Sequence, residues 1–113
     1  MGNLASVCNG QGAQGYMKAG WREQVLTVIA EIPPGRVTTY GRIAAMAEGA
    51  TPRLVARALR ELPTGHDLPW FRIITASRKL ADHPGAAEQR QHLAAEGVLL
   101  DARGRAPVER MWP

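Results

Sequence analysis

Residues 38–62 read TTYGRIAAMAEGATPRLVARALREL, and their pattern decides the fold. Apolar side chains recur at helical spacing up to Gly49, where the first segment is expected to end. Thr51 followed by Pro52 marks the start of a second helix, because Thr is favoured at the N-cap and Pro at the first helical position. Two short helices joined by the tight turn Glu48-Gly49-Ala50 predict a helix-turn-helix.

The flanking segments predict a small domain around this motif. A helix is predicted over residues 21–32 from its apolar spacing, and another over residues 86–96 from the glycine that follows it. A buried strand over residues 68–75, a polar loop over residues 77–85 and a short strand or hairpin over residues 101–112 complete the chain. The expected fold class is mainly α with a short β element, a winged helix-turn-helix.

The composition is that of one small basic domain. The chain has 113 residues, of which 45% are hydrophobic, so it can form a core and global disorder is excluded. Its net charge of +4 suits a phosphate-facing surface without requiring one. Residues 1–20 are rich in glycine and lack a periodic apolar face, so we expect a flexible N-terminal extension and a folded domain over residues 21–113.

Several classes of protein receive no support from the sequence. The single cysteine, Cys8, excludes an intrachain disulfide and does not support a Cys-based metal site. His66, His83 and His92 lack metal-ligand spacing, so neither a metal nor a cofactor is expected. No apolar run approaches the ~20 residues of a membrane span, and no secretory signal opens the chain. We expect a cytoplasmic monomer without membrane contact.

Three stretches resemble the motifs of one known family. Residues 34–41 read PGRVTTYG, residues 51–59 read TPRLVARAL and residues 68–74 read LPWFRII. In this order they resemble the tyrosine motif, the recognition helix and the active-site strand of the O6-alkylguanine-DNA alkyltransferases. The resemblance runs from about residue 21 to residue 96, and it implies the fold of the alkyltransferase C-terminal domain.

A departure at Trp70 changes the chemistry that the resemblance implies. The family's active-site strand reads Pro-Cys-His-Arg-Val, and its Cys accepts the alkyl group. Pro69, Arg72 and Ile73 match that frame. Trp70, however, stands at the position of the Cys, and Phe71 at that of the His. Since an indole offers no thiolate, the chain resembles the alkyltransferase-like proteins, which bind damaged DNA without repairing it, and no catalytic residue is expected.

The resemblance also implies a set of DNA contacts. Arg53 falls on the arginine that enters the base stack through the minor groove and fills the hole left by a flipped nucleotide. Tyr40 falls on the tyrosine that crowds the 3′ phosphate of the damaged nucleotide. The narrow groove favours small side chains such as Ala56, whereas Leu54 would obstruct it or act as an apolar wedge. The DNA-binding residues expected are Arg53, Tyr40, Thr39, Leu54, Ala56 and Arg57.

A pocket for the flipped base is implied as well. Trp70 is expected to line its floor, and the loop over residues 77–85 to close over it. Arg78, Lys79 and His83 are the candidates for a loop residue that senses the O6 atom of guanine. The pocket residues expected are Trp70, Tyr40, Pro69, Phe71, Ile73 and Arg78.

Glu96 matches the family's helix-end Glu, which activates the Cys through the His. Because this chain has neither residue of that relay, the expected role of Glu96 is structural, through a contact with Arg72 or Trp70. Arg72 itself is expected to stabilise the local structure through a buried ion pair.

The leading hypothesis is a protein that binds O6-alkylguanine in double-stranded DNA, flips the lesion without alkyl transfer, and hands it over to nucleotide excision repair proteins. Two alternatives remain open. The protein could be an active alkyltransferase with an atypical nucleophile such as Cys8. It could also be a winged-helix regulator that reads the major groove through basic residues of the second helix, namely Arg53, Arg57 and Arg60.

Overall fold

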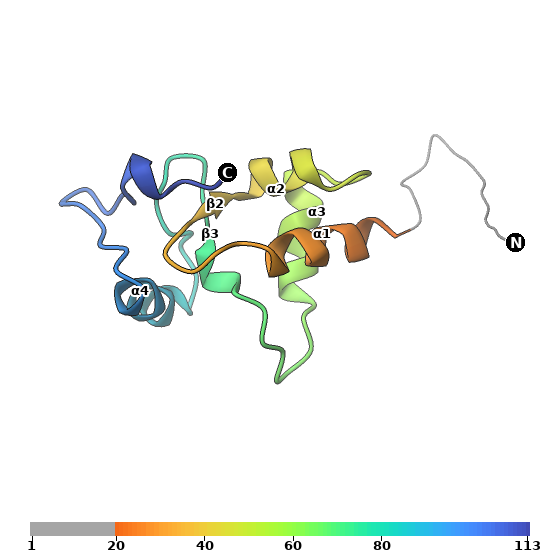
Figure 1. Cartoon of the computed structure of the whole chain (residues 1–113). Coiled ribbons are helices and arrows are strands. Elements are labelled where there is room, and N and C mark those ends of the chain that lie inside the picture. Colours follow the sequence, from red (N-terminus) through yellow and green to blue (C-terminus); the bar gives the residue numbers. More distant parts are fainter. Residues whose placement is uncertain (1–19) are drawn as a thin grey trace, which may run out of the picture.

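The computed structural model describes residues 20–113, and Figure 1 shows how their helices and strands are arranged. The predicted extension over residues 1–20, with Cys8, lies outside the described residues apart from Gly20. Three helices lie on one side of a short β pair, and a fourth helix lies on the other side (Figure 1).

The first three helices form the helix-turn-helix half of the molecule. These helices, α1 (Trp21–Ala30), α2 (Tyr40–Met46) and α3 (Pro52–Arg60), pack against one another. We call their shared interior the helical core. Its buried residues include Trp21, Val25, Ile29, Ile43, Val55 and Ala58.

Two threonines begin α2 and α3, as the sequence predicts. The hydroxyl of Thr39 accepts a hydrogen bond of 3.1 Å from the backbone N–H of Arg42. The hydroxyl of Thr51 accepts one of 3.2 Å from the backbone N–H of Leu54. Each cap satisfies a backbone donor that has no partner within its helix. The predicted helix-turn-helix is therefore confirmed.

A short parallel pair of strands connects this half to the rest of the chain. β2 (Thr38–Thr39) pairs with β3 (Ile73–Ile74). Successive side chains of a strand point to opposite faces, so the two isoleucines of β3 enter different cores. Ile73 packs in the helical core, and Ile74 packs in a second core formed with residues of the C-terminal half. The buried residues of that second core are Val37, Ile74, Leu93, Val98 and Ala106.

The strand predicted over residues 68–75 is wrong for most of its length. Trp70–Arg72 form the 3₁₀ turn η1, and only β3 is extended. The backbone N–H of Trp70 bonds the carbonyl of Leu68 over 2.8 Å, and that of Arg72 bonds the carbonyl of Pro69 over 3.0 Å. Since Pro69 has no N–H to donate to a ladder, these local hydrogen bonds replace strand pairing.

The short strand or hairpin predicted over residues 101–112 is also wrong. This segment forms isolated bridges at Arg105 and Met111 and the 3₁₀ turn η2 (Val108–Arg110). The carboxylate of Asp101 accepts two backbone N–H groups, over 2.8 and 3.0 Å, and closes a local turn that competes with an extended strand. The predicted fold class, mainly α with a short β element around a helix-turn-helix, is confirmed.

Arg72 and Glu96, both in the C-terminal half, form an ion pair that also binds the segment after α1. Nε of Arg72 donates to Oε1 of Glu96 over 3.0 Å, and its Nη2 donates to Oε2. Nη1 donates to the carbonyl of Ile32 over 2.8 Å, and the N–H of Gly35 donates to Glu96 over 3.0 Å. The two side chains are only 12% and 18% exposed. The guanidinium therefore holds the pKa of Glu96 below its usual range, and the structural pairing predicted from the sequence is present.

Replacing Glu96 with Gln should lower the free energy of unfolding at neutral pH by about 3 kcal/mol, because the buried guanidinium of Arg72 loses its counter-charge. Folding lowers the pKa of Glu96, so the pair stabilises above the carboxyl's unfolded pKa and its contribution is lost as the pH falls through the folded value. Urea unfolding of wild type and Glu96→Gln, from neutral pH down to about pH 3, measures this. A stability gap that stays constant over that range would contradict the ion-pair assignment.

Candidate nucleic-acid interface

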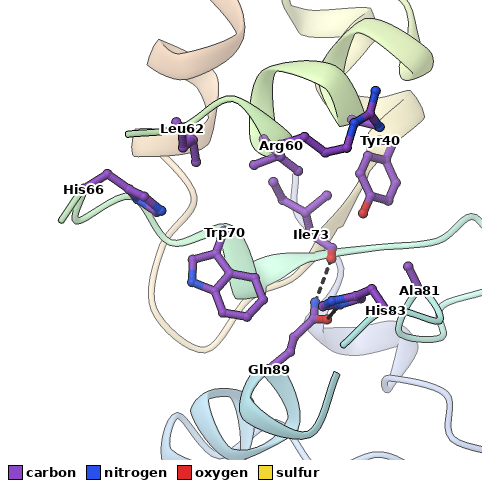
Figure 2. Close-up of a pocket in the computed structure, with 11 residues that line it drawn as sticks. Tyr40, Arg60, Leu62, His66, Trp70, Ile73, Ala81, His83 and Gln89 are labelled. Carbon is purple, nitrogen blue, oxygen red and sulfur yellow. Dashed lines mark hydrogen bonds between the residues drawn. The ribbon is translucent and has the colours of Figure 1, made fainter. Parts of the chain in front are cut away.

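A cavity of about 560 Å³ opens where the C-terminal half of α3, η1 and the loop before α4 (Ala86–Ala95) meet. Figure 2 shows Trp70, Tyr40 and His83 around it, each from a different segment of the chain. Leu59 and Ile73 add apolar surface to its wall. A concave site of roughly 300–1,000 Å³ with apolar walls and a few polar groups is typical of ligand binding.

Trp70 is presented to this cavity by η1. Its indole makes edge-to-face contacts with three rings, at centroid distances of 6.1 Å to Phe71, 6.2 Å to His83 and 6.1 Å to His92. The contact with Phe71, a pair of aromatic rings, contributes about 0.5–1.5 kcal/mol beyond area burial. The indole is therefore held in place from several sides, and its flat apolar surface suits contact with a planar base.

Tyr40 is the first residue of α2 and packs half-buried against the helical core. Burial raises the pKa of its phenol above the usual value, so the hydroxyl is protonated at neutral pH. Within residues 20–113 this hydroxyl has no hydrogen-bond partner, and it can donate to a ligand in the cavity.

Gln89 lines the cavity although no role was predicted for it. Its side chain is 2% exposed, and its Nε2 donates to the carbonyls of Phe71 and Ile73 over 3.1 and 2.9 Å. Its Oε1 lies 2.9 Å from Nε2 of His83. Of the three predicted loop candidates, only His83 lines the cavity. The spacing of Gln89 was the one sequence feature that indicated its burial. Gln89 precedes the buried Leu93 by four residues, so the two side chains lie on the same face of the helix.

Three residues predicted for the pocket lie outside the cavity wall. Phe71 packs against the second core, and its ring stacks on His92 with centroids 4.6 Å apart. Arg78 has a left-handed φ of 66°, and its Nη1 donates to the carbonyl of Ala106 over 2.7 Å. Pro69 is the N-cap residue of η1 and is not part of the wall. The 3₁₀ turn accounts for the positions of Pro69 and Phe71, because it redirects side chains that a strand would have alternated. Arg78 lies beyond the turn, and its guanidinium is held by the carbonyl of Ala106 instead.

One face of α3 extends from an exposed arginine in the first turn to the wall of the cavity. Arg53 is exposed in the first turn, and Ala56, three residues later, lines the cavity. Arg60, at the end of the helix, also lines the cavity and is exposed. Residues three and four apart share a helix face, so one face of α3 carries these three side chains.

The remaining predicted DNA-contact residues have partners within the protein. Thr39 caps α2, as described above. Leu54 packs partly buried against the helical core, which accounts for its apolar side chain. The Nε of Arg57 lies 3.2 Å from Oε2 of Glu61 on the protein surface. Exposed pairs of this kind contribute little stability, so Arg57 can exchange Glu61 for a phosphate at low cost.

The side chains around the cavity can stack, donate hydrogen bonds and exclude water. No thiol is found among the described residues that line it. Within residues 20–113, no group of three His, Cys, Asp or Glu side chains could hold a metal ion. No helix in that part of the chain is long and apolar enough to cross a membrane.

A family model described as 6-O-methylguanine DNA methyltransferase, DNA binding domain, matches residues 20–98. The chain belongs to this family. A DNA base-flipping protein of Vibrio parahaemolyticus is 39% identical over 89 residues, which are 77% of this chain and 89% of the relative. Alkyltransferase-like protein 1 of Schizosaccharomyces pombe is 35% identical over 81 residues, which are 68% of this chain and 75% of the relative. Within the family, the chain therefore groups with the alkyltransferase-like proteins.

Solved structures agree with this assignment. S. pombe Atl1 in complex with damaged DNA containing O6-carboxymethylguanine matches with a TM-score of 0.71 and 28% identity, over 85% of this chain and 97% of that one. The O6-methylguanine methyltransferase of Mycobacterium tuberculosis matches with a TM-score of 0.57 and 28% identity, over 92% of this chain and 58% of that one. The predicted likeness to the alkyltransferase fold is confirmed.

The phenol of Tyr40 should titrate above its ordinary pKa of about 10, because burial disfavours the phenolate. The difference in ultraviolet absorbance between wild type and Tyr40→Phe during alkaline titration isolates this group from Tyr16. Because folding raises the pKa of Tyr40, the stability that depends on its protonated phenol is fully present at a pH below the pKa of the unfolded chain. This stability is lost as the pH rises through the pKa of the folded protein. A midpoint at or below about 10 would be incompatible with a half-buried phenol.

Proposed function

We propose that this alkyltransferase-like protein binds double-stranded DNA through the minor groove and flips an O6-alkylguanine into the cavity, without alkyl transfer. The observation that carries the proposal is the position of Trp70, which walls a base-sized cavity beside the helix that presents Arg53. Relatives named as a DNA base-flipping protein, and the Atl1 complex with damaged DNA, support it.

The cavity chemistry favours a flipped, alkylated base. Trp70 and Ile73 offer apolar contact, which is non-directional and tolerates alkyl groups of different shape. Tyr40 places a protonated hydroxyl on the same cavity, where a rotated base or its phosphate arrives. Extrusion leaves a gap in the base stack, and the flat, charged guanidinium of Arg53 can fill it.

The absence of alkyl transfer follows from the groups at the expected active site. Trp70 has no thiolate to attack an alkyl carbon. The carboxylate of Glu96 is held by Arg72 and by the N–H of Gly35, and it has no imidazole at position 71 to activate. Phe71, at the family's His position, is packed in the second core.

A protein that binds a DNA lesion without removing it requires another pathway to repair that lesion. We propose that the folded domain over residues 21–113 acts as a DNA-associated cytoplasmic monomer and marks the lesion for nucleotide excision repair proteins. A protein that stays on an unrepaired base and bends the duplex presents a persistent distortion, which suits a recruiting signal.

The test compares duplexes of identical sequence that carry O6-methylguanine, O6-carboxymethylguanine or guanine. The proposal expects tighter binding to both lesions and full retention of a labelled methyl group on the DNA. Equal affinity for all three duplexes would support a winged-helix regulator instead. Transfer of the label to the protein would support an active alkyltransferase, and a Cys8→Ser variant would then identify the nucleophile.

Arg53→Ala should weaken binding to O6-methylguanine DNA by about 2 kcal/mol, because nothing then fills the gap left by the extruded base. Folding should be unaffected, since Arg53 is exposed. Fluorescence anisotropy measures the affinity, and Arg90→Ala, which removes an exposed guanidinium from α4, is the matched control. Equal losses in the two variants would mean that charge alone explains the effect.

Trp70→Cys should not restore repair at neutral pH. The new thiol would lack an imidazole at position 71 to take its proton, and Glu96 would remain paired with Arg72. Mass spectrometry of the variant after incubation with O6-methylguanine DNA measures stoichiometric methylation, with the double variant Trp70→Cys/Phe71→His as comparator. Rapid methylation of the single variant would show that the missing relay does not limit the chemistry.

Affinity should fall with added salt while the preference for damaged DNA persists. Each phosphate contact costs roughly one decade of affinity per decade of salt, whatever the base. Contact between the flipped base and Trp70 is apolar and is not screened. Titrations at rising NaCl on damaged and undamaged duplexes measure both quantities. A ratio of affinities that collapses toward one would assign the discrimination to charge.

A further inference from the structure

We propose that Gln89 is the positioning residue of the cavity, because it orients His83 and thereby holds the loop over residues 77–85 against Trp70. Its effect on lesion binding rests on the proposed function. The geometry that supports it lies within the protein alone and can be tested without DNA.

Hydrogen-bond roles leave the amide of Gln89 one orientation. The carbonyl oxygens of Phe71 and Ile73, 3.1 and 2.9 Å away, can only accept hydrogen bonds. The NH2 group of Gln89 must therefore face these two oxygens, and its Oε1 must face His83. Figure 2 shows Gln89 between Ile73 and His83. The side chain is 2% exposed, so water cannot substitute for either partner.

The same logic settles the tautomer of His83. Oε1 of Gln89 only accepts, so Nε2 of His83, 2.9 Å away, carries the proton. Nδ1 of His83 lies 3.0 Å from the backbone N–H of Gly85, which only donates, so Nδ1 is the acceptor. His83 is therefore neutral and protonated at Nε2, and two carbonyls, an amide, an imidazole and a backbone N–H form one continuous chain of hydrogen bonds.

This chain brings the imidazole and the loop into contact with Trp70. The rings of His83 and Trp70 meet edge to face, with centroids 6.2 Å apart and planes at 76°. A Cβ atom at Gly85 would lie 3.1 Å from Cε1 of His83 and 3.7 Å from Cη2 of Trp70. A side chain at this position would therefore push the imidazole aside by a few tenths of an ångström, and glycine permits the observed approach.

Gln89 thus connects three segments that build the cavity. From α4 it reaches the carbonyls on either side of Arg72, at the end of η1, and it reaches the loop through His83. Because both N–H bonds of the Gln89 amide and the N–H of His83 are engaged, these two side chains offer no free hydrogen-bond donor to a base. Their contribution to recognition is the shape of the wall, which makes Gln89 a positioning residue.

The first experiment measures the tautomer of His83 in the free, full-length protein by two-bond ¹⁵N–¹H correlation spectra. The Nε2–H tautomer is expected for the wild type. In Gln89→Met the N–H of Gly85 still makes Nδ1 the acceptor, so the expected change is the loss of the acceptor for Nε2–H, measured as faster exchange of that proton with water. Gln91→Met, the same substitution at an exposed position of α4, should leave the spectrum unchanged. A wild-type His83 in the Nδ1–H form, or one in rapid exchange between tautomers, would overturn the proposal.

The second experiment measures the ratio of affinities for O6-methylguanine and undamaged duplexes. Gln89→Met should lower this ratio at least about fivefold, the worth of one lost hydrogen bond, with the affinity for undamaged DNA unchanged. His83→Asn removes the contacts of the imidazole with Gln89 and with the ring of Trp70 but keeps the turn within the loop, because an Asn side chain can still accept from the N–H two residues on. It should give a similar loss, and it carries the test if Gln89→Met does not fold.

Failure of this inference differs from failure of the proposed function. If the wild-type protein shows no lesion preference, the proposed function is wrong, and the tautomer of His83 alone then tests whether Gln89 orients His83. If the wild-type preference for damaged DNA is unchanged in both Gln89→Met and His83→Asn, the positioning role of Gln89 is wrong and the proposed function stands.

Discussion

The ion pair of Arg72 and Glu96 is the contact on which the rest of the structure depends. It fixes the end of α4 to the last residue of η1, and the same two side chains bind the carbonyl of Ile32 and the N–H of Gly35, just after α1. The helix-turn-helix half and the C-terminal half are also joined by the β2–β3 pair and by the bridge between Val37 and Met111. Removing one partner would leave a buried charge at this junction, a far larger penalty than losing a surface pair.

The cavity exists because the two halves meet at a strand that is too short to seal the gap between them. Ile73 fills the helical core and Ile74 the second core, so β3 belongs to both. Immediately before it, η1 places Trp70 beside the cavity and Phe71 in the second core. A longer β3 would have continued the hydrogen bonding between the strands past Ile73. The 3₁₀ turn η1 ends that pairing and leaves the indole of Trp70 in the cavity wall.

The sequence predicted the parts of the fold that depend on local chemistry. Thr51-Pro52 and the glycine after α4 act through one or two residues, so α3 and α4 begin and end close to the predicted positions. The contact of Glu96 could be narrowed to Arg72 or Trp70 because Glu96 matches the family's relay Glu, and this chain lacks the His and the Cys of that relay. The two strand predictions failed where proline and Asp101 favour local turns. Gln89 escaped notice because its importance lies in three partners that only the folded chain assembles.

Under the proposed function, the satisfied polar groups of the wall determine how guanine and alkylguanine are told apart. Gln89 and His83 have no free hydrogen-bond donor, so apart from the hydroxyl of Tyr40 the base is selected by the cost of extrusion and by apolar contact. An O6-alkyl group weakens pairing, which lowers the cost of flipping, and each buried CH2 adds about 0.8 kcal/mol. Both terms favour the lesion without reading its chemical identity. A protein that performs no chemistry on the adduct gains from this breadth, because one wall of Trp70 and Ile73 then serves many alkyl groups.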